Sequence, residues 1–155
     1  MSDLKIILTP EGGDFELVGP DLVVINGFQN MPLIGLFGGN RKESTREYTE
    51  AEQRGDWWGN SYFMPNNSDI QFNSDLERLL YNVALTSESR LQIEQTVKRD
   101  LKFMLGFSTF TVSVSLIYVD QIEINIKIQE PGSLESTNFI YIWDSLKSEL
   151  INKSI

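Results

Sequence analysis

The 155-residue sequence contains no cysteine and no histidine. Without cysteine it forms no disulfide, has no thiol nucleophile and cannot build a zinc finger. Without histidine it lacks the usual general base near neutral pH, and a Ser-His-Asp triad is excluded. These two absences remove several large classes of enzyme mechanism.

Positive charge is scarce as well. The sequence has 13 lysines and arginines against 22 acidic residues, a formal net charge of −9. Phosphate backbones are bound mainly by lysine and arginine, so nucleic acid is not expected as a partner. A run of about 18 apolar residues and a basic-then-apolar leader pattern are also missing, so we expect no membrane span and a soluble protein made in the cytoplasm. The length is typical of one domain.

The first part of the chain predicts short strands separated by turns. Apolar residues alternate along residues 4–8, around Phe15 and Leu17, and along Leu22–Ile25, with glycine and proline between these segments. The next segment, Met31–Phe37, is apolar, and its pattern is compatible with a buried strand or with an irregular packed segment. Residues 38–73 show no clear periodicity and predict a long polar and aromatic loop.

Two helices are predicted after this loop. Ser74 is a candidate N-cap with Glu77 three residues later, followed by the apolar stripe of Leu76, Leu79, Leu80 and Val83. The second helix is expected to begin near Thr86 or Ser87 and to end at Gly106. Its predicted buried face consists of Ile93, Val97, Leu101, Met104 and Leu105.

A long β-hairpin is predicted next. The segments 109–118 and 122–129 alternate between apolar and polar residues, which is typical of antiparallel strands that cover a core on one face. An odd loop centred on Asp120 would pair Tyr118 with Ile122 and keep apolar residues opposite each other, so this register is favoured. The hydroxyl-rich face from Thr109 to Ser115 is compatible with a solvated sheet, and also with an exposed edge that accepts a strand from another chain.

The last predicted strand is Phe139–Trp143, and a short tail from about residue 144 is compatible with a frayed helix. The expected fold is therefore a single α+β domain over residues 1–155. Two adjacent α-helices would pack on an antiparallel sheet that includes the long hairpin, with short N-terminal strands and the long irregular loop at about 38–73.

The most unusual motif lies in this loop. Arg54, Asp56, Trp57, Trp58 and Asn60 fall within the segment RGDWWGN, in which glycines flank two adjacent tryptophans. Large indole rings can pin a loop to its own domain, anchor a partner subunit, or form a platform for a sugar ring. Packing of the loop on its own domain is favoured over a partner anchor, and a sugar platform is the least favoured.

The acidic residues are also compatible with a catalytic site or a cation site. A glycosidase needs only two carboxylates, and Asp56, Asp69 and Asp75 could meet in one cleft. Oxygen ligands such as Asn67, Asp69 and Asp75 could also approach a cation, although no spaced calcium loop is present. With 22 acidic residues in the chain, solvated surface charge is the favoured explanation of both sets. No cofactor and no metal are expected.

The order of these parts resembles the Mu-like phage baseplate protein family of contractile tails. The resemblance spans residues 15–143 and rests on the segments PLIGLFGG, RGDWWGN and FIYIWD, together with the two capped helices and the hairpin. The element Arg-Gly-x-Trp-Trp-Gly is its most specific part. The sequence departs from the family pattern at Asn60, where an acidic residue commonly follows the second glycine.

The resemblance implies a non-enzymatic structural protein of a phage or phage-derived tail, located in the baseplate of the virion and made in the host cytoplasm. It implies several copies per assembly, packed against other baseplate wedge proteins, with tail sheath or tube proteins as further partners. Under this interpretation Trp57 and Trp58 would anchor the loop on a partner. Arg54 and Asp56 would make polar contacts at the rim, and Asn60 would also belong to the partner-binding site. The alternative is a small tail-associated carbohydrate-active enzyme that uses acidic residues.

Overall fold

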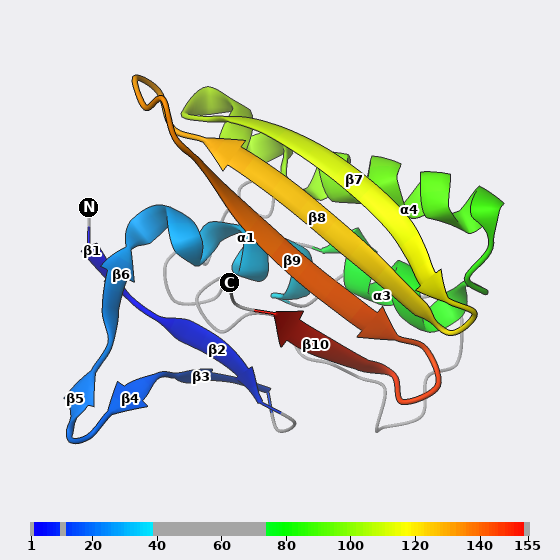
Figure 1. Ribbon diagram of the computed structural model, residues 1–155, viewed down its shortest axis with the longest axis horizontal. Coiled ribbons are helices and arrows are strands. Elements are labelled where there is room, and N and C mark those ends of the chain that lie inside the picture. Colours follow the sequence, from blue (N-terminus) through cyan, green and yellow to red (C-terminus); the bar gives the residue numbers. More distant parts are fainter. Residues whose placement is uncertain (1, 10–11, 39–73, 154–155) are drawn as a thin grey trace, which may run out of the picture.

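The computed structural model describes residues 2–9, 12–38 and 74–153. Within these residues the chain forms three α-helices and several antiparallel sheets (Figure 1). The largest sheet has four strands in the order β10-β9-β8-β7. The predicted mixture of helices and antiparallel strands is therefore confirmed at this level.

The four-stranded sheet supplies one side of the core. It consists of β7 (Thr109–Tyr118), β8 (Gln121–Gln129), β9 (Ser136–Asp144) and β10 (Glu149–Lys153). Alternate residues of β8 are buried isoleucines, because successive side chains of a strand point to opposite faces. On the opposite face of β7 and β8, serine and threonine lie across from polar residues such as Asn125 and Lys127.

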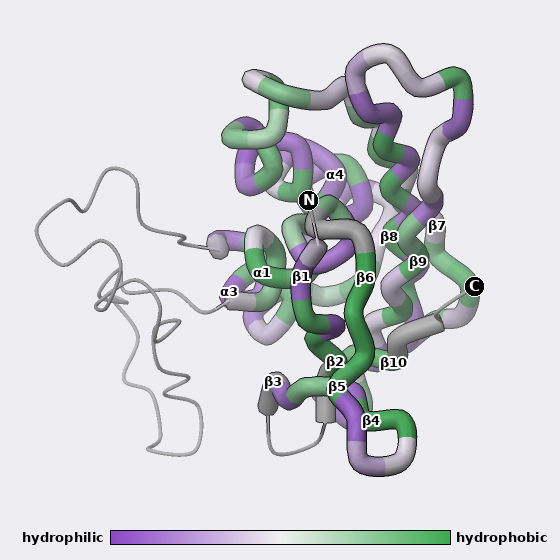
Figure 2. Tube along the Cα trace, turned by 90° about the vertical axis from the view of Figure 1, so that its left-hand side faces the viewer, coloured by the Kyte–Doolittle hydropathy of each residue, from purple (hydrophilic) through white to green (hydrophobic). Residues whose placement is uncertain are grey.

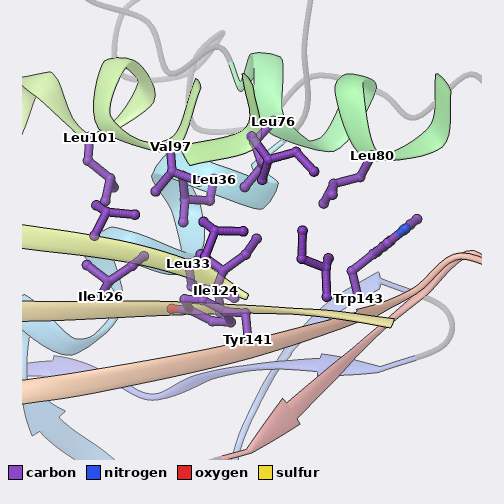
Figure 3. Packing of buried hydrophobic residues seen from close by; sticks show 14 of the residues in the cluster. Leu33, Leu36, Leu76, Leu80, Val97, Leu101, Ile124, Ile126, Tyr141 and Trp143 are labelled. Carbon is purple, nitrogen blue, oxygen red and sulfur yellow. The ribbon is translucent and has the colours of Figure 1, made fainter. Parts of the chain in front are cut away.

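The helices supply the other side of the core. α3 (Asp75–Asn82) and α4 (Ser87–Asp100) begin at the predicted caps, Ser74 and Thr86, whose side chains accept hydrogen bonds from N–H groups of the first turns. Figure 3 shows leucine and valine side chains of these helices above the apolar side chains of the sheet. The fully buried members of this cluster include Leu36, Leu76, Ile93, Val97, Leu101, Met104, Ile122, Ile124 and Ile126.

α4 is shorter than the sequence predicted. It ends at Asp100, and the chain continues as the 3-10 helix η3 (Lys102–Gly106), so that Met104 still reaches the core but Leu105 is exposed. The tighter winding of a 3-10 helix rotates the side chains away from the α-helical stripe. Leu105 therefore does not belong to the buried face.

The apolar segment 31–37, expected to be a strand or irregular, is instead the helix α1 (Met31–Phe37). Pro32 lies in the first turn, where its missing N–H is not needed, and Gly38 ends the helix with an N–H bond to the Ile34 carbonyl. Gly35 lies so close to the Phe103 ring that an added Cβ would approach it to 2.8 Å. The glycine that made the segment look unlike a helix thus permits close packing against η3.

A buried polar node joins the three helices. The Ser74 hydroxyl donates to the Leu36 carbonyl at the end of α1. The carboxylate of Asp100, the last residue of α4, accepts hydrogen bonds from the backbone N–H groups of Asp75 (2.9 Å) and Leu76 (2.8 Å) at the start of α3. One helix end therefore caps the beginning of another.

The hairpin register differs from the prediction. Leu116, not Tyr118, lies opposite Ile122, and Tyr118 pairs with Gln121 across a two-residue turn. The register shifts between Leu116 and Tyr118, so Ile117 is the extra residue of a β-bulge. This extra residue keeps apolar side chains opposite each other although the turn has an even number of residues.

The C-terminal tail is also different from the prediction. Residues 149–153 form the edge strand β10, paired with β9, rather than a frayed helix. The pairing places Leu150 opposite Trp143, and Leu150 packs against the core. Burial of one apolar side chain therefore favours the strand over the helix.

The N-terminal strands form a separate three-armed unit, which we call the N-terminal unit (residues 2–9 and 12–26). Its arms are the pairs of β1 (Ser2–Leu4) with β6 (Val24–Asn26), β2 (Ile6–Thr9) with β3 (Gly12–Phe15), and β4 (Leu17–Val18) with β5 (Asp21–Leu22) (Figure 1). The arms meet at three residues joined by a ring of backbone hydrogen bonds. Lys5 N–H donates to Val23, Val23 N–H to Glu16, and Glu16 N–H to Lys5, at 2.9–3.0 Å.

Asn30 attaches the N-terminal unit to the helical layer. Between this residue and β6 the chain forms the 3-10 helix η1 (Gly27–Gln29). The buried Asn30 side chain donates to the Leu4 carbonyl (2.6 Å) and to Asp3, and it accepts from the Ile6 N–H (3.1 Å). The NH2 group and the carbonyl oxygen of the Asn30 side chain thus both have hydrogen-bond partners in β1 and β2.

Candidate functional site

The predicted site lies outside the described residues. This applies to Arg54, Asp56, Trp57, Trp58 and Asn60, and the roles given to them stay predictions. Asn67 and Asp69, from the carboxylate and cation interpretations, are also outside.

Asp75 is the one candidate acid that the structure describes. It lies in the first turn of α3, and its carboxylate forms an ion pair with Arg99 of α4 (Nη2 to Oδ2, 2.9 Å). A carboxylate near a helix N-terminus and beside an arginine contributes to the packing of two helices. Asp75 thus has a structural role in the described residues.

The described residues contain another candidate, the outer edge of β7. β7 is the last strand in the sheet order, and within the described ranges no strand pairs with its outer side. It is ten residues long, and its sequence TFTVSVSLIY contains no charged residue and no proline. Long uncharged edge strands offer unpaired backbone groups to an added strand.

The opposite edge of the sheet has different properties. β10 is half as long as β7, and it carries Glu149 at one end and Lys153 at the other. Short length and charged side chains are common devices that discourage pairing with another chain. Of the two edges, β7 is therefore the better template for strand addition.

Exposed apolar side chains gather at the end of β7. Leu116 and Ile117 are a little over one third exposed, Tyr118 is 68% exposed and Val119 is 94% exposed. Four consecutive apolar residues around a turn give the edge an apolar tip that a partner can cover. Tyrosine combines a large ring with a polar hydroxyl and is enriched in protein interfaces.

Hydrogen bonds join the β7–β8 turn, directly after the tip, to the turn that follows β9. Both the N–H and the hydroxyl of Ser145 donate to the Asp120 carbonyl, at 2.8 and 3.0 Å. On the adjacent strands, the Gln121 amide donates to the Asp144 carboxylate (2.9 Å), which also accepts from the N–H groups of Leu146 and Lys147. The Gln121 amide, followed by these backbone N–H groups, lowers the pKa of Asp144.

Arg90 of α4 contacts the middle of β7. Its guanidinium donates to the Val114 carbonyl at 3.2 Å and lies 3.8 Å from the Glu94 carboxylate. The helix thus contributes one polar contact to the edge strand and fixes β7 against α4. Leu116 to Val119 lie beyond this contact along the chain.

Sequence reasoning recognised the edge as a possible docking strand but missed the tip. The signal was present, because Leu116-Ile117-Tyr118-Val119 is an apolar run that reaches into a turn, where polar residues are usual. The tip was missed because the sequence was interpreted as a regular strand in which side chains alternate between two faces. Such an alternation does not indicate a bulge at Ile117.

Metal-binding and membrane-spanning features are absent from the described residues, which do contain a pocket. In the described part of the chain, no group of three or more acidic side chains is placed to hold a metal ion, and no helix is long and apolar enough to cross a membrane. A pocket of about 240 Å³ lies between η1 and the β8–β9 connection, and its lining includes Phe28, Phe139, Glu130 and Glu135. Asp75 does not line it.

Searches against family models, curated proteins and solved structures found no match for this chain.

Proposed function

We propose that the protein is a non-enzymatic structural subunit of a contractile tail baseplate, from a phage or a phage-derived particle. In this role it packs against other wedge proteins, with sheath or tube proteins as further neighbours. The resemblance of residues 15–143 to Mu-like baseplate proteins supports the class of particle, and the β7 edge supports the mode of assembly.

The observation that carries the proposal is the edge of β7. A ten-residue edge strand without charge or proline, ending in an apolar tip, is a surface that a monomeric protein would normally protect. Strand addition uses the unpaired backbone groups for affinity and neighbouring side chains for specificity. The two adjacent helices α3 and α4, packed on the apolar face of the sheet, would form the frame that holds this edge in place.

The first experiment asks whether the chain belongs to such a particle. Contractile tails purified from cells that carry this gene are analysed by quantitative mass spectrometry. We expect this chain in a constant ratio to the sheath, tube and wedge proteins of the same particle. Its absence from intact tails would overturn the proposed function.

The second experiment asks whether β7 makes the contact. Ser113 of β7 and Asn125 of β8 are directly opposite each other on the polar face, so they offer a matched pair of positions. Ser113→Lys places a long charged side chain on the edge strand, whereas Asn125→Lys places it on a central strand. We expect incorporation into tails to fall about tenfold for Ser113→Lys only, a fold-change that corresponds to about 1.4 kcal/mol. Equal incorporation of both variants would exclude the β7 edge.

A further inference from the structure

The three arms of the N-terminal unit repeat one short pattern. The three residues that form the ring of backbone hydrogen bonds, Lys5, Glu16 and Val23, each stand between two apolar neighbours in the sequence. The resulting triplets are Leu4-Lys5-Ile6, Phe15-Glu16-Leu17 and Leu22-Val23-Val24. The same pattern at all three positions indicates a common arrangement of side chains.

The six apolar neighbours lie on one face of the unit. Side chains alternate along an extended chain, so residues i−1 and i+1 share the face opposite to residue i. Cross-strand partners also share a face, and the strand pairs place Leu4 opposite Val24, Ile6 opposite Phe15 and Leu17 opposite Leu22. These six residues therefore form a continuous apolar face around the junction.

Four of the six side chains of this apolar face are exposed to solvent. Leu17 and Val24 are each 62% exposed, and Phe15 and Leu22 are exposed by nearly half, while Leu4 is partly buried and Ile6 packs against the core. Figure 2 shows hydrophobic stretches of the tube along β6 and β4. Two-stranded ribbons have little stability of their own in water, so an open apolar face on them is suited to being covered.

The charges of the unit lie on the opposite face. Lys5 and Glu16 form an ion pair there (2.5 Å). The second pair of each arm, counted from the junction, joins an aspartate to an aliphatic residue. These pairs are Asp3 with Ile25, Asp14 with Ile7, and Asp21 with Val18. Four acidic side chains against one lysine leave the described residues of the unit with an excess of three negative charges.

This charge decides between possible occupants of the apolar face. The unit is a single layer of chain, so its aspartates lie within about one Debye length, roughly 8 Å, of whatever covers the face. A second copy would bring the same excess of negative charge in this unit and a net charge of −9, and anionic lipid headgroups would also be repelled. A protein surface with lysine and arginine around an apolar centre is attracted.

We infer that the apolar face of Leu4, Ile6, Phe15, Leu17, Leu22 and Val24 is a docking surface for a different protein chain, one that presents an apolar patch bordered by lysine and arginine. The inference rests on the proposed function in one respect: we expect the partner chain to be a neighbouring subunit in the same particle.

The experiment places a photo-crosslinker on each face of one arm. p-Benzoylphenylalanine replaces Leu17, or Val24 as a second position, in the full chain expressed in cells that carry the gene. Val18 is the matched control, because it adjoins Leu17, is 68% exposed and lies on the opposite face. Mass spectrometry then identifies the crosslinked peptides.

We expect the Leu17 and Val24 probes, but not the Val18 probe, to join a second protein at an apolar peptide bordered by lysine or arginine. With that protein purified, Leu17→Thr should weaken binding about tenfold and Val18→Thr less than about twofold, because only the former removes covered apolar surface. Binding should also weaken as salt rises.

Six results would overturn the inference. Three are crosslinks to the wrong target, namely a second copy of this chain, lipid, or another part of the same chain. The others are equal crosslinking from both faces, no product from Leu17 and Val24, and a partner peptide without lysine or arginine. Absence of the chain from tail particles would overturn the proposed function but leave these crosslinks readable, so the two failures are distinguishable.

Discussion

Single residues with buried polar groups connect the parts of this molecule. Asn30 binds the N-terminal strand through three hydrogen bonds, and Asp100 caps α3 from the end of α4. Leaving a buried backbone group unsatisfied costs about 1–3 kcal/mol, so each of these side chains stabilises the junction at which it lies.

Asp100 should also make stability depend on pH. Burial raises the pKa of its carboxyl from 3.8 to about 6, because desolvation outweighs the hydrogen bond from the Leu76 N–H and the nearby Arg99, and Asp75 adds to the increase. The folded protein therefore holds this proton more tightly than the unfolded chain. Its stabilising contribution is complete below the unfolded pKa and is lost as pH rises through about 6.

We predict that Asp100→Asn removes this part of the pH dependence. Relative to the variant, the wild-type protein should lose about 1.4 kcal/mol of unfolding free energy between about pH 5 and 7.5. Urea denaturation of both proteins at several pH values measures this difference. Parallel stability curves would show that burial does not raise the pKa of Asp100 in solution.

At the scale of elements, the bulge at Ile117 means that deleting one residue of β7 has different effects at different positions. Removing Ile117 takes out the residue that has no cross-strand partner and leaves the register of the other pairs intact. Removing Ser113 shifts one part of β7 by one residue and turns its apolar side chains to the polar face.

We predict that deletion of Ile117 costs about 1 kcal/mol of stability, whereas deletion of Ser113 prevents folding. Circular dichroism and thermal denaturation of the two variants provide the comparison. If both deletions had the same effect, the bulge would not be at Ile117.

The elements also show how far the sequence could predict the fold. The strongly periodic segments, β7, β8 and α3, together with the caps Ser74 and Thr86, were predicted because their local patterns agree with their burial. α1 was not recognised, because Gly35 and Pro32 are poor helix formers in isolation, and only the closeness of Phe103 explains the glycine. The strand β10 depends on pairing with β9, which no local pattern contains.

For the candidate site, the sequence indicated an edge strand but not which edge is open. That depends on the order β10-β9-β8-β7, which is a property of the whole sheet. The apolar face of the N-terminal unit likewise depends on three strand pairs that meet at one junction. The predicted tryptophan motif lies outside the described residues and stays a prediction.

At the scale of the whole molecule, the two proposed contact surfaces are far apart. In Figure 1, β7 lies on the upper side of the sheet and the N-terminal unit on the lower left, beyond the opposite edge. A subunit with two separate docking surfaces can hold two neighbours at once, as a connector in a larger particle does.

We predict that the two surfaces act independently. The loss of affinity that Leu17→Thr causes for the partner of the apolar face should be the same in a Ser113→Lys background, within about 0.5 kcal/mol. Isothermal titration calorimetry with that purified partner measures both differences. A larger deviation from additivity would show that the surfaces belong to one interface.

The open edge of β7 has a consequence for handling the protein. Alternate residues of this uncharged strand direct backbone groups outward, and apart from the Val114 carbonyl that Arg90 contacts, copies produced without a partner present them to one another, an arrangement from which ordered aggregates grow. Overproduction of the chain alone should therefore give a larger aggregated fraction than co-expression with a partner that covers this edge. Under the proposed function, the timing of translation, as much as the affinity of the parts, would then govern the yield of finished particles.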